Sequence, residues 1–276
     1  MSQENIKQSL RMQAKDCLLE SDCQQKIRKT HQLYDELCMQ LLLIDENLVD
    51  DSPCIAGCPE KPELVPAYKL PRRGVAGTNG HAALMHSFAH IEFNAINIAW
   101  DAVYRFPHMP VQYYLDWALI AREEAEHFCL INNYLKSIDH EYGSFKAHDD
   151  LWEMVQKTSD DVLLRMAMVP RVLEARGLDV TPAIIEKFRH HGFQQAVDIL
   201  VIIYHDEIGH VKIGNYWFNY LCKQRGLDPV NTFMSLIREY AADKIRKPFN
   251  EVARSEAGFT PFELELLNSW QPTKPR

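Results

Sequence analysis

The chain has 276 residues, of which 46% are hydrophobic and 25% are charged, a balance that is typical of globular proteins with a buried core. The formal net charge of -8 argues against a general nucleic-acid binder, because such proteins are usually basic. The N-terminus carries no apolar segment of the secretory type, and no stretch long enough to span a bilayer is free of charges, so a cytoplasmic protein is expected.

The N-terminal part is predicted to be helical and to lead into a long irregular connection. Residues 2–43 are rich in Leu, Gln, Lys and Glu, which favours one long helix or two shorter ones. Residues 50–80 are dense in Pro and Gly. A connection of this length is usually functional or wraps the domain, so we expect it to cover part of the molecule.

The cysteines indicate a reducing environment. Their number is odd, seven, in a chain without an export signal, and this favours free thiols in the cytoplasm. Cys54 and Cys58 frame the stretch CIAGC, which fits a redox pair or half a zinc site. No second pair of Cys or His residues at zinc-ribbon spacing accompanies them, so we interpret both as ordinary loop thiols.

Two long helices are predicted directly after the connection. The first spans about residues 81–105 and stops before Pro107, because the residue before a proline avoids helical geometry. The second follows Pro110 and ends ahead of Gly143. Both contain polar residues within otherwise apolar faces.

A third long helix is predicted after Ser159. Pro170 is expected to kink or divide it, since proline lacks the amide hydrogen that the helix needs. Gly177 is expected to stop it. Thr181 and Pro182 then form a good N-cap and first helical position for a separate short helix.

The fourth long helix is predicted between Gly192 and about residue 224, and residues 229–268 are expected to give two or three shorter helices. Strand signals are nearly absent, so the sequence predicts an all-α protein built around a four-helix bundle. We expect one compact domain with three parts. Residues 1–80 would form the N-terminal helices and the connection, residues 81–226 the bundle with its site, and residues 227–276 the C-terminal helical tail.

Two Glu-x-x-His pairs are the candidate metal-binding motifs of the sequence. Glu124 and His127 form one pair, Glu207 and His210 the other, and residues three apart share a helix face. Each pair is preceded by a further glutamate on the long helix before it. These two glutamates are Glu92 and Glu174.

The repeated pattern predicts a dinuclear metal site. In a helical bundle, two Glu-x-x-His helices and two Glu helices that project inward hold two metal ions. Four carboxylates match the charge of two divalent ions, and imidazole with carboxylate suits iron or manganese. The alternative is four unrelated surface acids, which the apolar flanks such as ILVIIYH disfavour.

Acids also precede both pairs and are candidates to orient the histidines. Metal-bound histidines usually donate their second N–H group to a carboxylate. We expect Asp206 to hold His127 and Glu123 to hold His210, each from the neighbouring part of the bundle. The alternative is that both acids face solvent.

Three further residues lie on the faces that carry the ligands. Trp117 and Tyr204 would line a pocket beside the metals, and Arg171 would pair with an acid or an anionic substrate. An ordinary core or ion-pair role is at least as common for such residues. His90 points away from Glu92 round their helix, and packing or hydrogen-bonding roles are favoured for both His90 and His86.

Several longer stretches resemble a bacterial ferritin-like family catalogued as a domain of unknown function: KPELVP, RRGV, AHIEFNAINIAWDAVYRFP, VPRVLEARGLDVTP and DEIGHVKIGNYWF. The likeness runs from about Pro59 to Asp228. It implies a ferritin-like bundle with added terminal helices and a wrapping loop, and two iron ions on six ligands. The implied ligands are Glu92, Glu124, His127, Glu174, Glu207 and His210.

This resemblance to the di-iron carboxylate superfamily also implies a function. By analogy Glu124 and Glu174 would bridge two iron ions, or a manganese and an iron ion. The pair would activate dioxygen, and a small organic substrate would be hydroxylated or oxidised, as by a monooxygenase. An unidentified electron donor is required, no membrane partner is expected, and the oligomeric state, a homodimer included, is left open. No catalytic residue is assigned beyond the metal centre.

Three alternatives remain open. A ferroxidase or peroxide-scavenging iron protein would oxidise added Fe(II) repeatedly without an organic partner. A more distant resemblance is to the tRNA-hydroxylating di-iron monooxygenase, which would need a basic rim, for which Lys69, Arg72 and Arg73 are candidates. A helical interaction module that keeps a metal only for stability would melt at lower temperature without metal and consume no oxygen.

Overall fold

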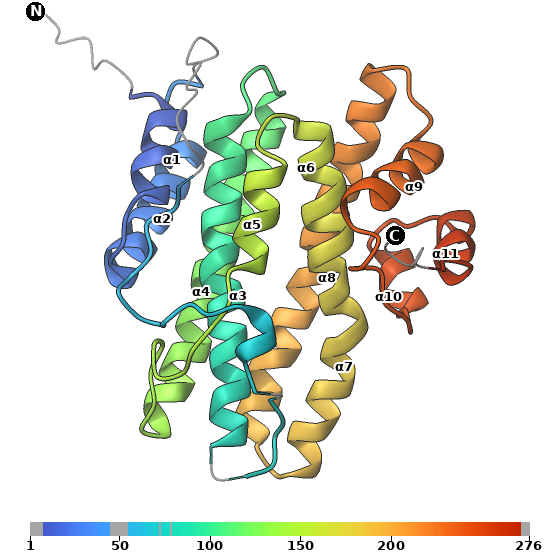
Figure 1. Ribbon diagram of the computed structural model, residues 1–276. Helices are drawn as coiled ribbons and strands as arrows, with labels where there is room; N and C mark the ends of the chain where they lie inside the picture. Colours follow the sequence, from blue (N-terminus) through green and yellow to red (C-terminus); the bar gives the residue numbers. More distant parts are fainter. Residues whose placement is uncertain (1–7, 45–54, 72, 78, 272–276) are drawn as a thin grey trace, which may run out of the picture. The chain divides into compact units, whose positions relative to one another are not determined.

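The computed structural model of the protein describes residues 8–44, 55–71, 73–77 and 79–271 (Figure 1). These residues form helices joined by turns and loops, with isolated β-bridges in place of strands, which confirms the predicted all-α helical fold. The chain divides into two compact units, residues 1–152 and residues 153–276. Among the described residues, none of the helices combines the length and the hydropathy that crossing a bilayer requires.

Two short helices begin the first unit, in agreement with the second of the two expected arrangements. They are α1 (Leu10–Leu18) and α2 (Cys23–Cys38). Asp22 starts α2 as its N-cap, because its side chain accepts a hydrogen bond from the backbone N–H of Gln25. Within this unit α1 packs against the third helix and α2 against the fourth.

A buried lysine fixes part of the Pro- and Gly-rich connection to these helices. The ammonium group of Lys26 donates hydrogen bonds to the carbonyl oxygens of Leu18 and Gly57, at 2.9 and 3.2 Å, and to the side chain of Asn97. Position 57 accepts only glycine, because a Cβ atom there would lie 2.2 Å from the carbonyl oxygen of Leu19. The connection therefore covers the first unit at this point, as expected.

The cysteines that the structure describes are free thiols, as their odd number indicated. Cys58 is exposed on the connection. Cys54, with which it was paired in sequence, lies outside the described residues. The interpretation of Cys54 and Cys58 as loop thiols therefore stays a prediction for the pair.

Two long helices form the centre of the first unit, α3 (Gly80–Arg105) and α4 (Val111–Ser137), teal and green in Figure 1. Their bounds agree with the prediction to within a few residues. The short connection through Pro107 and Pro110 reverses the chain, so the two helices run antiparallel and pack along each other. Their facing sides are buried and largely apolar, which gives the polar residues among them a dry environment.

The second unit begins within a short helix that the sequence reading did not predict, α5 (Asp150–Lys157). Next come α6 (Val162–Met168), a π-helical turn (Val169–Glu174) and α7 (Ala175–His190), which follow one another without a break. The expected disturbance at Pro170 is therefore confirmed, in the form of a π-helical turn.

Two expectations for this segment are wrong. Gly177 does not stop the helix, and Thr181 with Pro182 does not start a new one, because both positions lie inside α7. Gly177 is not among the glycines with positive φ, so it does not adopt a left-handed helix end. The buried face formed by Leu178, Ile185 and Phe188 continues through the segment, and its burial outweighs the local preferences.

The remaining helices agree with the prediction. The long helix α8 (Gln194–Gln224) is followed by α9 (Pro229–Tyr240), α10 (Glu251–Glu256) and α11 (Pro261–Asn268). Within the second unit α8 packs along α7, α9 packs on α6 and α8, and α10 packs on α7 and α8. The tail thus lies against the helices that carry the predicted ligands of this unit.

Candidate metal centre

The first unit brings three of the predicted ligands together. Glu92 lies on α3, whereas Glu124 and His127 lie on α4, and all three side chains are buried. Nδ1 of His127 is 3.3 Å from Oε2 of Glu92 and 3.3 Å from Oε2 of Glu124. Each residue offers a ligand atom within 4.8 Å of the other two, a spacing that one metal ion can bridge. We call these residues the first half-site.

Aromatic residues directly follow two of these ligands in the chain. Phe93 follows Glu92 in the chain and Phe128 follows His127, and both rings are buried, with their centroids 5.6 Å apart. The ring of Tyr142 packs against both, at 5.4 and 5.1 Å. The three ligands themselves are each only 1% exposed, which makes an isolated charge there costly.

The charge of the metal-free half-site follows from this burial. Burial and then the neighbouring Glu124 raise the pKa of Glu92 well above its ordinary value, so Glu92 keeps its proton to higher pH than an ordinary glutamate. Burial lowers the pKa of His127, but its hydrogen bonds to Glu124 and Glu92 outweigh this and raise it. When Glu92 and His127 each hold a proton and Glu124 is ionised, the cluster is neutral. A divalent ion that replaces these two protons leaves it neutral as well.

Metal affinity is therefore expected to rise with pH, because bound protons must leave before the ligands can coordinate. Release of two protons per ion corresponds to about a hundredfold in affinity for each pH unit. Anaerobic Fe(II) titrations of a His210→Ala variant at several pH values would measure this for the first half-site. An affinity that does not change with pH would contradict the protonated cluster.

The second unit carries the other Glu-x-x-His pair. Glu207 and His210 lie one helical turn apart on α8, with Nδ1 of His210 3.9 Å from Oε2 of Glu207. His210 is buried and Glu207 half-buried. Glu174, at the end of the π-helical turn, is half-buried with its Oε2 atom enclosed. Within this unit the described residues do not bring Glu174 into a three-ligand group with the pair.

The two acids that precede the pairs are half-buried and interact with neighbouring groups. Glu123 and its expected partner His210 belong to different units, as do Asp206 and His127. Their roles in orienting the histidines stay predictions.

The three expected pocket residues have different environments. Trp117 is fully buried, with its ring centroid 6.2 Å from that of Tyr113. The hydroxyl of Tyr204 accepts a hydrogen bond of 2.9 Å from Asn250. Arg171 is buried and forms an ion pair with Glu263. An acid or an anionic substrate was the expected partner, and the structure contains the acid. The sequence did not identify Glu263 as the partner of Arg171, because the two residues lie far apart along the chain.

The two histidines set aside in the sequence have structural contacts, as expected. His90 places Nδ1 2.9 Å from the hydroxyl of Tyr142 and Nε2 3.0 Å from the carbonyl oxygen of His148. His86 accepts a hydrogen bond of 2.9 Å from the backbone N–H of Gly143. Burial lowers the pKa of His90 to about 4 and that of His86 to about 3, so both are neutral.

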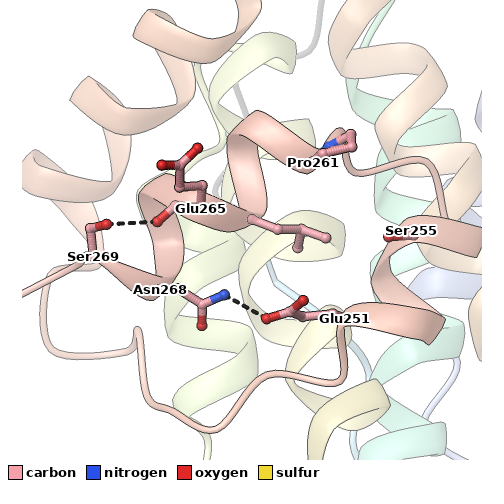
Figure 2. Close-up of a pocket in the computed structure, with 7 residues that line it drawn as sticks. Glu251, Ser255, Pro261, Glu265, Asn268 and Ser269 are labelled. Atoms are coloured by element: carbon pink, nitrogen blue, oxygen red, sulfur yellow. Dashed lines mark hydrogen bonds between the residues drawn. The ribbon is translucent and has the colours of Figure 1, made fainter.

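Two other candidate regions do not involve the ligands. A hollow of about 440 Å³ lies between α10 and α11, and none of the predicted ligand or pocket residues lines it. Figure 2 shows two of its lining residues, Asn268 and Glu251, joined by a hydrogen bond that Asn268 donates. Of the three basic residues proposed for a tRNA rim, Arg72 lies outside the described residues. Arg73 donates hydrogen bonds to Ser87 and to a backbone carbonyl of its own unit.

Comparisons with known proteins support the part of the resemblance that concerns a family of unknown function. Residues 19–265 match a family model described as "Protein of unknown function (DUF455)". A protein of Haemophilus influenzae, described as "Uncharacterized protein", is 44% identical over 271 residues, which are 95% of this chain and 94% of that protein. No solved structure matches the chain. The chain therefore belongs to the DUF455 family.

Proposed function

We propose that the protein is a di-iron carboxylate oxidoreductase of the ferritin-like superfamily, which activates dioxygen and hydroxylates or oxidises an organic substrate in the cytoplasm. The observation that carries the proposal is the buried half-site of Glu92, Glu124 and His127. Three ionisable groups that are each only 1% exposed are costly to bury in charged form without a cation. Their grouping is therefore best explained by a metal ion.

The donor set fits iron. Carboxylate and imidazole ligands without thiolates favour iron or manganese over structural zinc or an iron–sulfur cluster. The sequence repeats the Glu-x-x-His pair in the second unit, again with a preceding glutamate. We propose that the six residues of this sequence pattern would hold two ions, with manganese as an alternative to one iron.

The bound ions would supply the redox chemistry of dioxygen activation. The chain itself would hold the ions in a fixed geometry and release protons from Glu92 and His127 as they bind. The burial of these ligands would keep bulk water from the ions, which protects reactive species from side reactions. An electron donor would be required for turnover.

Anaerobic loading with Fe(II) followed by admission of air tests the proposal. We expect about two irons per chain, as in other bundles with this ligand pattern, and a ferric charge-transfer band after air is admitted. No bound iron and no spectral change would remove the proposed centre. Continued oxidation of each new portion of Fe(II), without any organic substrate, would instead identify a ferroxidase.

A further inference from the structure

The π-helical turn Val169–Glu174 is an unusual backbone segment that ends on a proposed ligand. The backbone N–H of Ala175 donates to the carbonyl oxygen of Pro170, five residues earlier, where an α-helix would use the fourth. The extra residue turns everything after it by roughly 100° round the helix axis. The direction in which Glu174 points therefore depends on whether this turn is kept.

The turn is held first by a glycine on α8. A Cβ atom at Gly214 would lie 2.2 Å from Cβ and 2.5 Å from Cγ of Pro170. Such contacts are far shorter than van der Waals contact, so any larger residue at position 214 must displace the proline. By contrast, a Cβ atom at Gly209 on the same helix would meet nothing within 4 Å.

An arginine inside the turn is held by the C-terminal tail. Arg171 forms its ion pair with Glu263 of α11. Its guanidinium carbon also lies 4.3 Å from the ring centroid of Phe218, 4.0 Å from that of Phe233 and 5.0 Å from that of Phe259. A cation enclosed by three rings and a carboxylate has few alternative positions.

Arg254, an arginine of the C-terminal tail, contacts Ala175, the residue that follows the turn. Arg254 of α10 donates a hydrogen bond of 3.2 Å to the carbonyl oxygen of Ala175, which directly follows Glu174. It also donates two hydrogen bonds of 2.8 Å to the carboxylate of Asp179, one turn further along α7. The tail therefore contacts the chain on both sides of Glu174.

We infer that residues 229–271 and Gly214 are positioning elements that keep the π-helical turn and so aim Glu174 at the metal. This inference rests on the proposed function, because it concerns one ligand of the proposed centre. It gives the C-terminal tail a role: the tail would not touch the metal but would act through Arg171 and Ala175. A positioning role of this kind is how neighbouring groups commonly tune metal ligands.

Cobalt(II) titration with optical spectra tests the inference, because the ligand-field bands of cobalt report the geometry of its ligands. We expect Gly214→Ala to keep its helical circular dichroism but to weaken binding of one equivalent of Co(II) by at least tenfold and to shift its bands. The matched variant Gly209→Ala should bind Co(II) like the wild type.

The outcomes separate the two proposals. If the wild type binds no Co(II) and no Fe(II), the proposed function fails and this inference fails with it. If the wild type binds two equivalents and Gly214→Ala binds them with the same affinity and spectrum, only the positioning role is overturned. If Gly214→Ala does not fold, Glu263→Asp, which keeps the charge beside Arg171 but shortens its reach, should show the same shift in the cobalt bands; unchanged bands would overturn the inference.

Discussion

Replacing either α4 ligand of the first half-site, in the variants His127→Ala and Glu124→Ala, is expected to abolish tight metal binding at that half-site while the helical circular dichroism survives. Loss of a group that only orients a ligand costs about 10- to 100-fold in affinity, so loss of a ligand itself should cost more than about 100-fold. The fold should persist because α3 and α4 are held together by a large apolar interface around the site. Iron content after anaerobic loading measures the effect.

Glu126→Ala is the matched control for these variants. Glu126 lies on the same helix between the two ligands, but its side chain is 49% exposed and pairs with Arg122 on the surface. Its loss should leave the iron content unchanged and alter the free energy of unfolding only slightly. Full iron occupancy in both ligand variants would mean that the metal binds elsewhere or that the first half-site has another purpose.

Much of the helical structure could be predicted because it follows from local signals. The bounds of α3, α4 and α8 agree with the sequence because prolines and glycines mark their ends and their apolar residues recur at helical spacing. The caps of the tail helices are equally local. Thr260 and Glu263, for example, form a capping box at the start of α11.

The segment around the π-helical turn could not be predicted in the same way. Gly177 and Pro182 are strong local signals for a helix end and a helix start, yet α7 runs through both. Proline at position 182 loses one backbone hydrogen bond, a modest cost beside the burial of Leu178, Ile185 and Phe188. Whether α7 continues through these positions depends on the tertiary packing of the second unit, which local sequence preferences do not encode.

The candidate site, like the fold, could be predicted from the sequence only in part. The grouping of Glu92, Glu124 and His127 was predicted from the spacing of the Glu-x-x-His pair and a glutamate on the preceding helix. The partner of Arg171 was not, because no local rule connects it to a glutamate 92 positions away. A buried arginine needs an acid, but the sequence offers many acids and only the fold selects one.

Removing the charge of that acid, in the variant Glu263→Gln, is expected to lower the free energy of unfolding by about 3–5 kcal/mol, because it leaves a buried guanidinium without its counter-ion. The pair is almost completely enclosed, with side-chain exposures of 0% for Arg171 and 5% for Glu263. Glutamine can still reach back to the N-cap residue Thr260, so the helix start should be kept. Urea unfolding of the metal-free protein measures the loss.

The loss in the free energy of unfolding caused by Glu263→Gln should become smaller as the pH falls. Burial raises the pKa of Glu263, but the charge of Arg171 outweighs it, and the net pKa is lowered. A lowered pKa in the folded state stabilises the protein above the ordinary glutamate pKa, and this stabilisation is lost as the pH falls through the folded value. The difference between the wild type and Glu263→Gln should therefore shrink in acid.

Two further variants decide whether the loss comes from the unpaired charge. Glu265→Gln makes the same substitution at an exposed position of α11 and should change stability by less than about 0.5 kcal/mol. Arg171→Met combined with Glu263→Gln removes both charges, and replacing a buried ion pair in this way is often neutral or stabilising. The double variant should therefore be more stable than Glu263→Gln alone. If it is less stable, the aromatic contacts of Arg171 stabilise the protein by more than its unpaired charge destabilises it.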